Sequence, residues 1–229
     1  MTNLKYTPID YTIWNFEGTG RNLRLSPIEQ EIWDRALQFQ DSRKGEKGHA
    51  EVVTYFALKL LGYHPQAGRD VVVSAAILHD VGWSQLTEIE RRLFYEMGDD
   101  GTGIPIWKRY EQELRQRHQE QGVKKAGEIL DQCDSPLSNR GGILEIISEH
   151  DTRKGFLNVN DGLMRDADKL WRFTLLNWKM ELAMRGYSPE DSEKYLLAYF
   201  DKPGFFYSRV SEQIARIELR NTLKTYEEH

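Results

Sequence analysis

Four histidines lie in segments where apolar residues recur every three or four positions. Each imidazole then shares a helix face with apolar side chains, so we expect it to point toward the interior. A single buried histidine is usually a core residue that makes a hydrogen bond to a carbonyl. Burying four imidazoles with no common ligand would cost the desolvation of a polar group four times. One or two metal ions would satisfy all four. They are His49, His79, His118 and His150.

Two aspartates extend this set. Asp80 follows His79 directly, and Asp168 lies on the apolar face of its predicted helix. A carboxylate there needs a cation or a strong hydrogen-bond donor. Adjacent residues cannot share one face of a regular helix, so we expect the helix to end at His79 and Asp80, with Gly82 suited to terminate it. Donors of these types suit Fe, Mn, Co, Ni or Zn, and ligand type alone selects none of them.

Basic residues near these positions could bind an anionic substrate. Arg165 and Arg172 lie three residues before and four residues after Asp168, so all three share one side of the helix. Arg153 and Lys154 stand in the loop after the fourth histidine. All four could instead be ordinary solvated charges; of the four, Arg172 is the preferred ligand for an anion.

Three further residues have two interpretations each. Asp151 could act as a general base or orient the attacking water, although carboxylates are also common at helix ends. Trp83 and Trp171 could stack on a nucleobase, but the pattern favours the core. The sequence contains neither a phosphate-cradling glycine loop of the Walker type nor a dinucleotide fingerprint, which disfavours nucleotide binding by those two routes.

The elements that would position these residues are helical. Apolar residues recur at three and four positions far more often than at two, which predicts an all-α fold. Ser26 and Glu29 have the spacing of a capping box, with Pro27 at the first helical position. Residues 98–103 are expected to form an exposed loop, which could be a lid, after a short helix. The longer predicted helices span about 26–42, 45–61, 67–80, 107–132, 142–151, 161–185, 189–199 and 206–226.

Composition narrows the class of protein. The 229 residues suffice for one large domain, and a net charge of -5 disfavours an extended nucleic-acid surface. The single Cys133 excludes an internal disulfide framework and a zinc site with two thiolates. The longest apolar run, 71–78, is too short to cross a bilayer, and the first 25 residues lack a signal-peptide block, so we expect a cytoplasmic protein. We expect an N-terminal extension over 1–25, a metal-binding helical domain over 26–185, and C-terminal helices over 186–229 packed on the same domain.

The order and context of the histidines and aspartates resemble the HD-domain superfamily of metal-dependent phosphohydrolases. His49 is followed by the sequence AAILHDVG at 75–82 and by DADKL at 166–170, and the resemblance covers roughly 45–172. It implies a compact HD-domain-like helical bundle with additional C-terminal helices. It also implies a first metal bound by His49, His79, Asp80 and Asp168.

Two further histidine segments resemble HD branches that hold two metals. His118 begins the sequence HQEQGVKKAG, and His150 lies within ISEHDTRKG. By this resemblance, His118, His150 and Asp80 would bind a second ion, with Asp80 bridging the two.

The resemblance implies a hydrolase that cleaves a phosphomonoester or nucleotide with a metal-activated water, using one or two ions. An HD-type di-iron oxygenase, as in the inositol oxygenase group, has a similar six-ligand set, and the ligands do not separate the two chemistries. A non-catalytic, metal-bound nucleotide-binding module is a third interpretation. The expected partner is a small phosphorylated substrate, and we expect no association with a membrane. The natural substrate, the identity of the metal and the oligomeric state stay open.

Overall fold

Helices account for the regular secondary structure of the computed structural model, which describes residues 4–14, 16–42, 47–94, 105–133 and 137–228. These ranges contain no β-strand, which confirms the predicted all-α class. The helices are α1 (Pro27–Ala36), α2 (His49–Leu61), α3 (Arg69–Leu78), α4 (Glu88–Leu93), α5 (Ile106–Asp131), α6 (Leu137–Ser148), α7 (Val159–Trp171), α8 (Leu175–Arg185), α9 (Pro189–Leu197) and α10 (Arg209–Glu227), with the 3-10 turns η1 (Leu37–Phe39) and η2 (Val81–Gln85). The predicted loop over 98–103 lies outside the described residues.

Side-chain caps define where several helices begin. The backbone N–H of Glu29 donates to Ser26 Oγ, and Glu29 Oε2 accepts from the Ser26 N–H at 2.7 Å, so the predicted capping box opens α1. The Asn158 side chain accepts from the backbone N–H groups of Asn160 and Asp161 and opens α7. This second cap fixes the start of the helix that carries Asp168.

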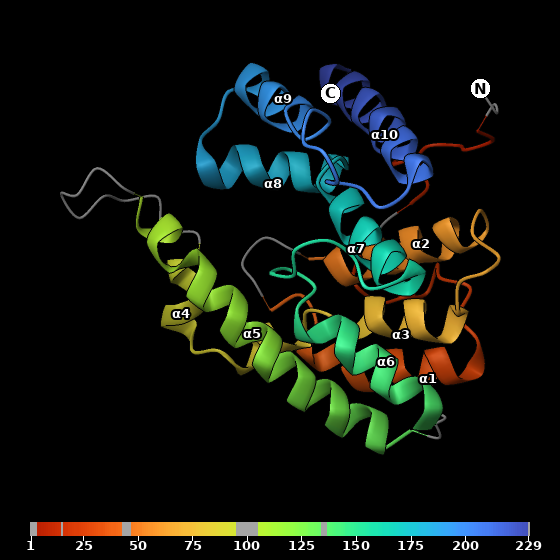
Figure 1. Ribbon diagram of the computed structural model, residues 1–229. Coiled ribbons are helices and arrows are strands. Elements are labelled where there is room, and N and C mark those ends of the chain that lie inside the picture. Colours follow the sequence, from red (N-terminus) through yellow and green to blue (C-terminus); the bar gives the residue numbers. More distant parts are fainter. Residues whose placement is uncertain (1–3, 15, 43–46, 95–104, 134–136, 229) are drawn as a thin grey trace.

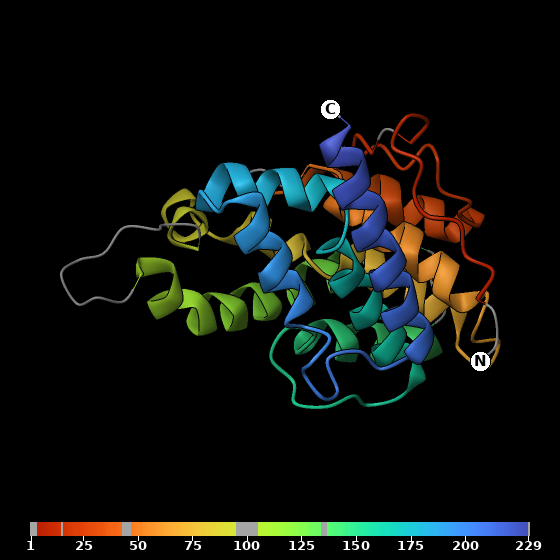
Figure 2. The same ribbon diagram turned by 90° about the horizontal axis from the view of Figure 1, so that it is seen from above.

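The apolar helix α3 lies at the centre of the fold. Its residues 72–78 are buried, and it packs against α1, α2, α6 and α7. Figure 1 shows α8, α9 and α10 grouped at one end of the molecule and α1, α3, α5 and α6 at the other, with α7 between the groups. Figure 2, seen from above, shows α10 in front of the central helices and α5 extending to the left of them. The centre is therefore surrounded by helices.

The prediction of a single helix over 161–185 is wrong, because two helices occupy this range. Helix α7 ends at Trp171 and α8 begins at Leu175, where the Thr174 side chain accepts from the backbone N–H of Asn177. The apolar period continues across the break, so periodicity alone does not reveal it. Arg172 consequently stands at the C-terminal end of α7 rather than inside a helix. Smaller differences are that the first helix ends at 36 before η1, and that α6 spans 137–148 rather than 142–151.

Both flanks of the central helices join the same buried cluster. The backbone N–H of Ile9 donates to Glu218 Oε1 on α10 at 2.9 Å, and the Tyr6 hydroxyl donates to the same oxygen. Asn221 Nδ2 donates to the Ile9 carbonyl at 2.8 Å. Ile9 and Ile214 both belong to the main apolar core, so the N-terminal segment and α10 pack on the central helices. The helices of the described ranges all lack the combined length and apolarity that a bilayer span requires.

Candidate metal centre

The six side chains singled out in the sequence come from five regions and meet in one place. His49 is the first residue of α2, His79 caps the C-terminal end of α3, and Asp80 precedes η2. The other three are His118 within α5, His150 just after α6, and Asp168 within α7. All four histidines are buried, as the apolar helix faces predict.

A first set of ligand atoms lies where α2, α3 and α7 meet. His49 Nε2 is 3.1 Å from His79 Nε2 and 3.4 Å from Asp168 Oδ1. The distance from His79 Nε2 to Asp168 Oδ1 is 3.7 Å. The three residues offer ligand atoms within 4.8 Å of one another, so they could hold a metal ion.

A second set of ligand atoms lies beside the first. His118 Nε2 is 3.4 Å from His150 Nε2, and Asp80 Oδ1 is 3.5 Å from the former and 3.4 Å from the latter. The other carboxylate oxygen, Asp80 Oδ2, lies 3.4 Å from His49 Nε2 and 3.6 Å from His79 Nε2. Asp80 thus presents one oxygen to each set.

Hydrogen bonds fix the orientation of three of the imidazoles. A carbonyl oxygen can only accept, so each Nδ1 facing one must carry the proton. His79 Nδ1 donates to the Ala76 carbonyl at 2.8 Å, His150 Nδ1 to the Ile147 carbonyl at 2.9 Å, and His118 Nδ1 to the Leu114 carbonyl at 3.3 Å. In the neutral ring the Nε2 lone pair is then directed at the centre, which is how metal-binding histidines are oriented.

The electrostatics of the cluster also suit a cation. Burial alone would lower the pKa of His79, but Asp80 and Asp168 outweigh it and raise that pKa to about 9. For Asp168, burial is outweighed by His79 and His49, so its pKa lies below the ordinary value. The carboxylates therefore attract positive charge into a buried space. Two ligands at about 2.1 Å from one ion stand roughly 3.0–3.4 Å apart, close to the separations found here. The residues fit a transition metal.

Gly82 serves a different purpose from the one predicted. Helix α3 already ends at Leu78, and Gly82 lies inside η2 without a positive φ. A Cβ at this position would overlap the His118 carbonyl oxygen and the Gly122 nitrogen, and would lie 2.8 Å from Gly122 Cα. The glycine therefore permits close contact between η2 and α5, which brings His118 up to Asp80.

Trp83 contacts the centre from this same turn. Its indole is buried, stacks on the His118 ring with centroids 4.3 Å apart, and donates from Nε1 to Asp80 Oδ1 at 3.2 Å. Trp171 is also buried and meets the His49 ring edge-on at 5.1 Å. Both tryptophans are core residues, as the sequence favoured, and each packs against one of the four clustered histidines.

Asp151 lies at the edge of the second set. Its Oδ2 lies 3.6 Å from His118 Nε2 and forms an ion pair with Arg115 Nη1 at 2.6 Å. Burial alone would raise the pKa of Asp151, but Arg115 and the two histidines keep it well below its usual range. A carboxylate held this way is a weak base, so its contacts favour orienting a ligand over abstracting a proton. Sequence reasoning missed Arg115, although it lies three residues before His118 and shares its helix face.

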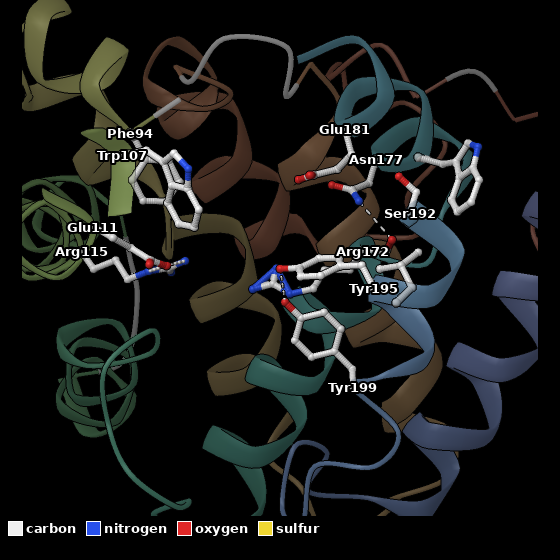
Figure 3. A pocket seen from close by; sticks show the side chains of 12 residues that line it. Phe94, Trp107, Glu111, Arg115, Arg172, Asn177, Glu181, Ser192, Tyr195 and Tyr199 are labelled. Atoms are coloured by element: carbon white, nitrogen blue, oxygen red, sulfur yellow. Dashed lines mark hydrogen bonds and ion pairs between the residues drawn. The ribbon is translucent and has the colours of Figure 1, made fainter. Parts of the chain in front are cut away.

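A cavity of about 210 Å³ is lined by Arg172 and by Arg115, the partner of Asp151 at the edge of the second set (Figure 3). Arg172 Nε is buried, and within the described ranges it has no hydrogen-bond partner. Burial alone would lower the pKa of Arg172, yet nearby Tyr199, Asp168 and Asp151 raise it, so the guanidinium stays charged. The lining residues are Phe94, Trp107, Glu111, Arg115, Arg172, Asn177, Trp178, Glu181, Ser192, Tyr195, Leu196 and Tyr199.

The other three predicted substrate cations are not among the residues that line this cavity. Arg165 Nη1 donates to the Gly155 carbonyl at 2.5 Å, and its Nη2 donates to the Arg153 carbonyl at 2.9 Å. Arg153 pairs with Glu149 at 2.9 Å, and Lys154 is exposed. Arg165 and Arg153 thus hold the loop after α6, and substrate binding by these three residues stays a prediction.

The helical fold and the His and Asp cluster are compatible with an HD domain. Comparisons of the chain with protein-family models, with curated proteins and with solved structures return no match.

Proposed function

We propose that this chain is a metal-dependent phosphohydrolase of the HD type, acting on a phosphomonoester or nucleotide. One observation carries the proposal: Asp80 presents one oxygen to each of two histidine sets. Arg172 lines a cavity whose other arginine, Arg115, pairs with Asp151 beside the second set. Two neighbouring ligand sets that share one carboxylate could hold two ions close together, which suits two-metal phosphoester hydrolysis.

Two bound transition-metal ions would supply Lewis acidity, which neutralises phosphoryl charge and lowers the pKa of a water. The chain itself provides the geometry. Asp80 lies between the two histidine sets, with one carboxylate oxygen toward each. Trp83 donates a hydrogen bond to Asp80 Oδ1 and covers one face of the His118 ring. Asp151, fixed by Arg115 at 2.6 Å, is placed to accept a hydrogen bond from a water at the second set.

The phosphate is proposed to bind Arg172. The other arginine of the cavity, Arg115, already pairs with Asp151 at 2.6 Å and with Glu111 at 3.0 Å. Arg172 instead keeps a buried N–H without a partner in the described ranges. A phosphate oxygen would satisfy this donor, and charge-assisted hydrogen bonds of this type are among the stronger ones in proteins.

Metal content and phosphate release, measured together, test the proposal. The full chain is purified without added metal, analysed for transition metals, and assayed on a panel of phosphomonoesters and nucleotides under nitrogen and in air. We expect about two metal ions per chain and equal phosphate release in both atmospheres. Turnover that consumes oxygen, without phosphate release under nitrogen, would contradict hydrolysis and favour the di-iron oxygenase.

Substitutions at the centre sharpen this test. We expect Asp80→Ala to lose metal and activity together, because both ligand sets lose an oxygen, whereas Asp201→Ala, an exposed aspartate, keeps both. Arg172→Met should retain its metal and raise KM by roughly tenfold or more, since a hydrogen bond to a charged group is worth about 1.5–3 kcal/mol. Full activity of the Asp80→Ala protein would refute the proposed function.

A further inference from the structure

The cavity lined by Arg115 and Arg172 combines a cationic end with aromatic walls and a polar far side. We infer that it is a specificity pocket for the alcohol part of the substrate, and that this part is a compact planar aromatic group with a hydrogen-bond donor at its far edge. The inference rests on the proposed function, because it assumes that the phosphate lies at Arg172. It makes Trp107, Tyr195 and Tyr199 the residues that select the ring.

Three of the five aromatic side chains that line the cavity come from α5, from α9 and from the turn just after α9. Trp107 belongs to α5, Tyr195 to α9 and Tyr199 to that turn, and Figure 3 shows the tryptophan and the tyrosines on different sides of Arg172. The two tyrosine hydroxyls are joined by a hydrogen bond of 2.5 Å, and their rings meet edge to face at 5.2 Å. This bond holds the tyrosines in a fixed relation. A planar ring can stack on or pack edge-on against such walls, whereas a saturated ring gains only burial.

The size of the cavity limits the ligand. Its volume of about 210 Å³ lies below the roughly 300–1,000 Å³ of typical small-molecule sites. A single ring attached to one phosphate suits this space better than an extended substrate does.

The far side of the cavity suits a hydrogen-bond donor better than a second negatively charged group. Glu181, Asn177 and Ser192 lie together there, away from Glu111 and Arg115 (Figure 3). Ser192 Oγ is buried and has no hydrogen-bond partner in the described ranges. The Glu181 carboxylate would repel a negatively charged substituent and would attract an amino group. The pocket therefore matches an aromatic ring with an uncharged or cationic donor on the side of Glu181 and Ser192.

Calorimetric binding of phosphonates to the full chain tests the pocket without hydrolysis, because their P–C bond resists phosphoester cleavage. Benzylphosphonate and cyclohexylmethylphosphonate have the same charge and nearly the same size. We expect the aromatic compound to bind about fivefold more tightly, since aromatic contacts add roughly two- to tenfold beyond burial. Tyr199→Leu and Trp107→Leu should bring this ratio toward one, whereas Tyr199→Phe, which keeps the ring, should retain it.

The far side has its own test. We expect 4-aminobenzylphosphonate to bind at least tenfold more tightly than 4-carboxybenzylphosphonate, and Ser192→Ala to weaken the amino compound selectively. Equal affinities in either pair of phosphonates, or a leucine variant that keeps the aromatic preference, would overturn the inference. The proposed function fails separately: if phenyl phosphate is not hydrolysed but the binding preferences hold, the pocket stands and the hydrolase does not.

Discussion

Replacing Gly82 with alanine should damage one ligand set and spare the other. Gly82 lies in η2, two residues after Asp80, and touches α5 at the carbonyl of His118. A methyl group there must push η2 and α5 apart. This movement would separate Asp80 Oδ1 from His118 Nε2, now 3.5 Å apart.

The cost follows from the contacts that the new Cβ would make. It would lie 2.8 Å from Gly122 Cα and closer still to two other backbone atoms, whereas Cβ atoms in proteins essentially never approach within 3.0 Å. Backbone cannot rotate out of the way as a side chain can. Overpacking of this kind typically costs about 1–3 kcal/mol, so we expect a loss near 3 kcal/mol or above. That is a large share of the roughly 5–15 kcal/mol that stabilises a domain.

Gly122→Ala is the matched control, because Gly122 faces Gly82 across the same contact. Its Cβ would lie 3.3 Å from the Ile147 Cγ2 methyl, 3.6 Å from the His79 carbonyl oxygen and 3.7 Å from the Gly82 nitrogen, so no backbone atom outside α5 comes within 3.4 Å. Alanine also gains about 1 kcal/mol of helix propensity in α5, which offsets this crowding. We expect the free energy of unfolding of the control to lie within about 1 kcal/mol of that of the native chain.

Urea unfolding of the metal-free proteins and metal analysis of the loaded proteins measure the two effects. We expect Gly82→Ala to be destabilised and to retain about one metal per chain, held by His49, His79, Asp168 and the Asp80 oxygen that faces them. Gly122→Ala should retain about two. If Gly82→Ala keeps native stability and two metals, the close contact between η2 and α5 does not position the second set, and this reasoning is wrong.

Three other substitutions test separate parts of the structure. Burial raises the pKa of Glu218 from 4.5 to about 7, so the stability that Glu218 contributes is complete below about pH 4.5 and is lost as the pH rises through 7. Glu218→Gln should remove this loss, which is about 3 kcal/mol in the free energy of unfolding. Urea unfolding at pH 4.5 and pH 8 measures it, and the same loss in both proteins would argue against this role of Glu218. Trp83→Phe keeps the ring beside His118 but deletes the bond to Asp80, and should weaken metal affinity by about tenfold in a chelator competition, while unchanged affinity would exclude this supporting role. Arg115→Met leaves the Asp151 carboxylate without its 2.6 Å partner and should destabilise the metal-free chain by about 3–5 kcal/mol. Thermal unfolding measures this effect, and a native Tm would contradict it.

The sequence predicted the parts of the fold that depend on local signals. The capping box at Ser26 and the apolar faces of α2, α3 and α7 follow from residue spacing, and the structure has them. The break between α7 and α8 was not predicted, because the apolar period continues through it. Thr174, an ordinary N-cap residue, was the available signal.

The six candidate ligands were found because each stands on an apolar helix face or next to one that does. Contacts between distant elements were not accessible in the same way. Gly82 was expected to end a helix, since the sequence gives no indication that α5 passes against it. Arg165 shares the helix side of Asp168, as its spacing predicts, but the loop carbonyls that occupy it come from residues whose position depends on the whole fold.

Anomalous X-ray diffraction from crystals of the full chain, recorded at the absorption edge of the metal found by elemental analysis, tests most directly whether the six side chains form one centre. We expect two peaks roughly 3.5–4 Å apart, with Asp80 between them. One should be bound by His49, His79 and Asp168, and the other by His118 and His150. An anomalous peak at other side chains, or none in metal-loaded crystals, would contradict this account.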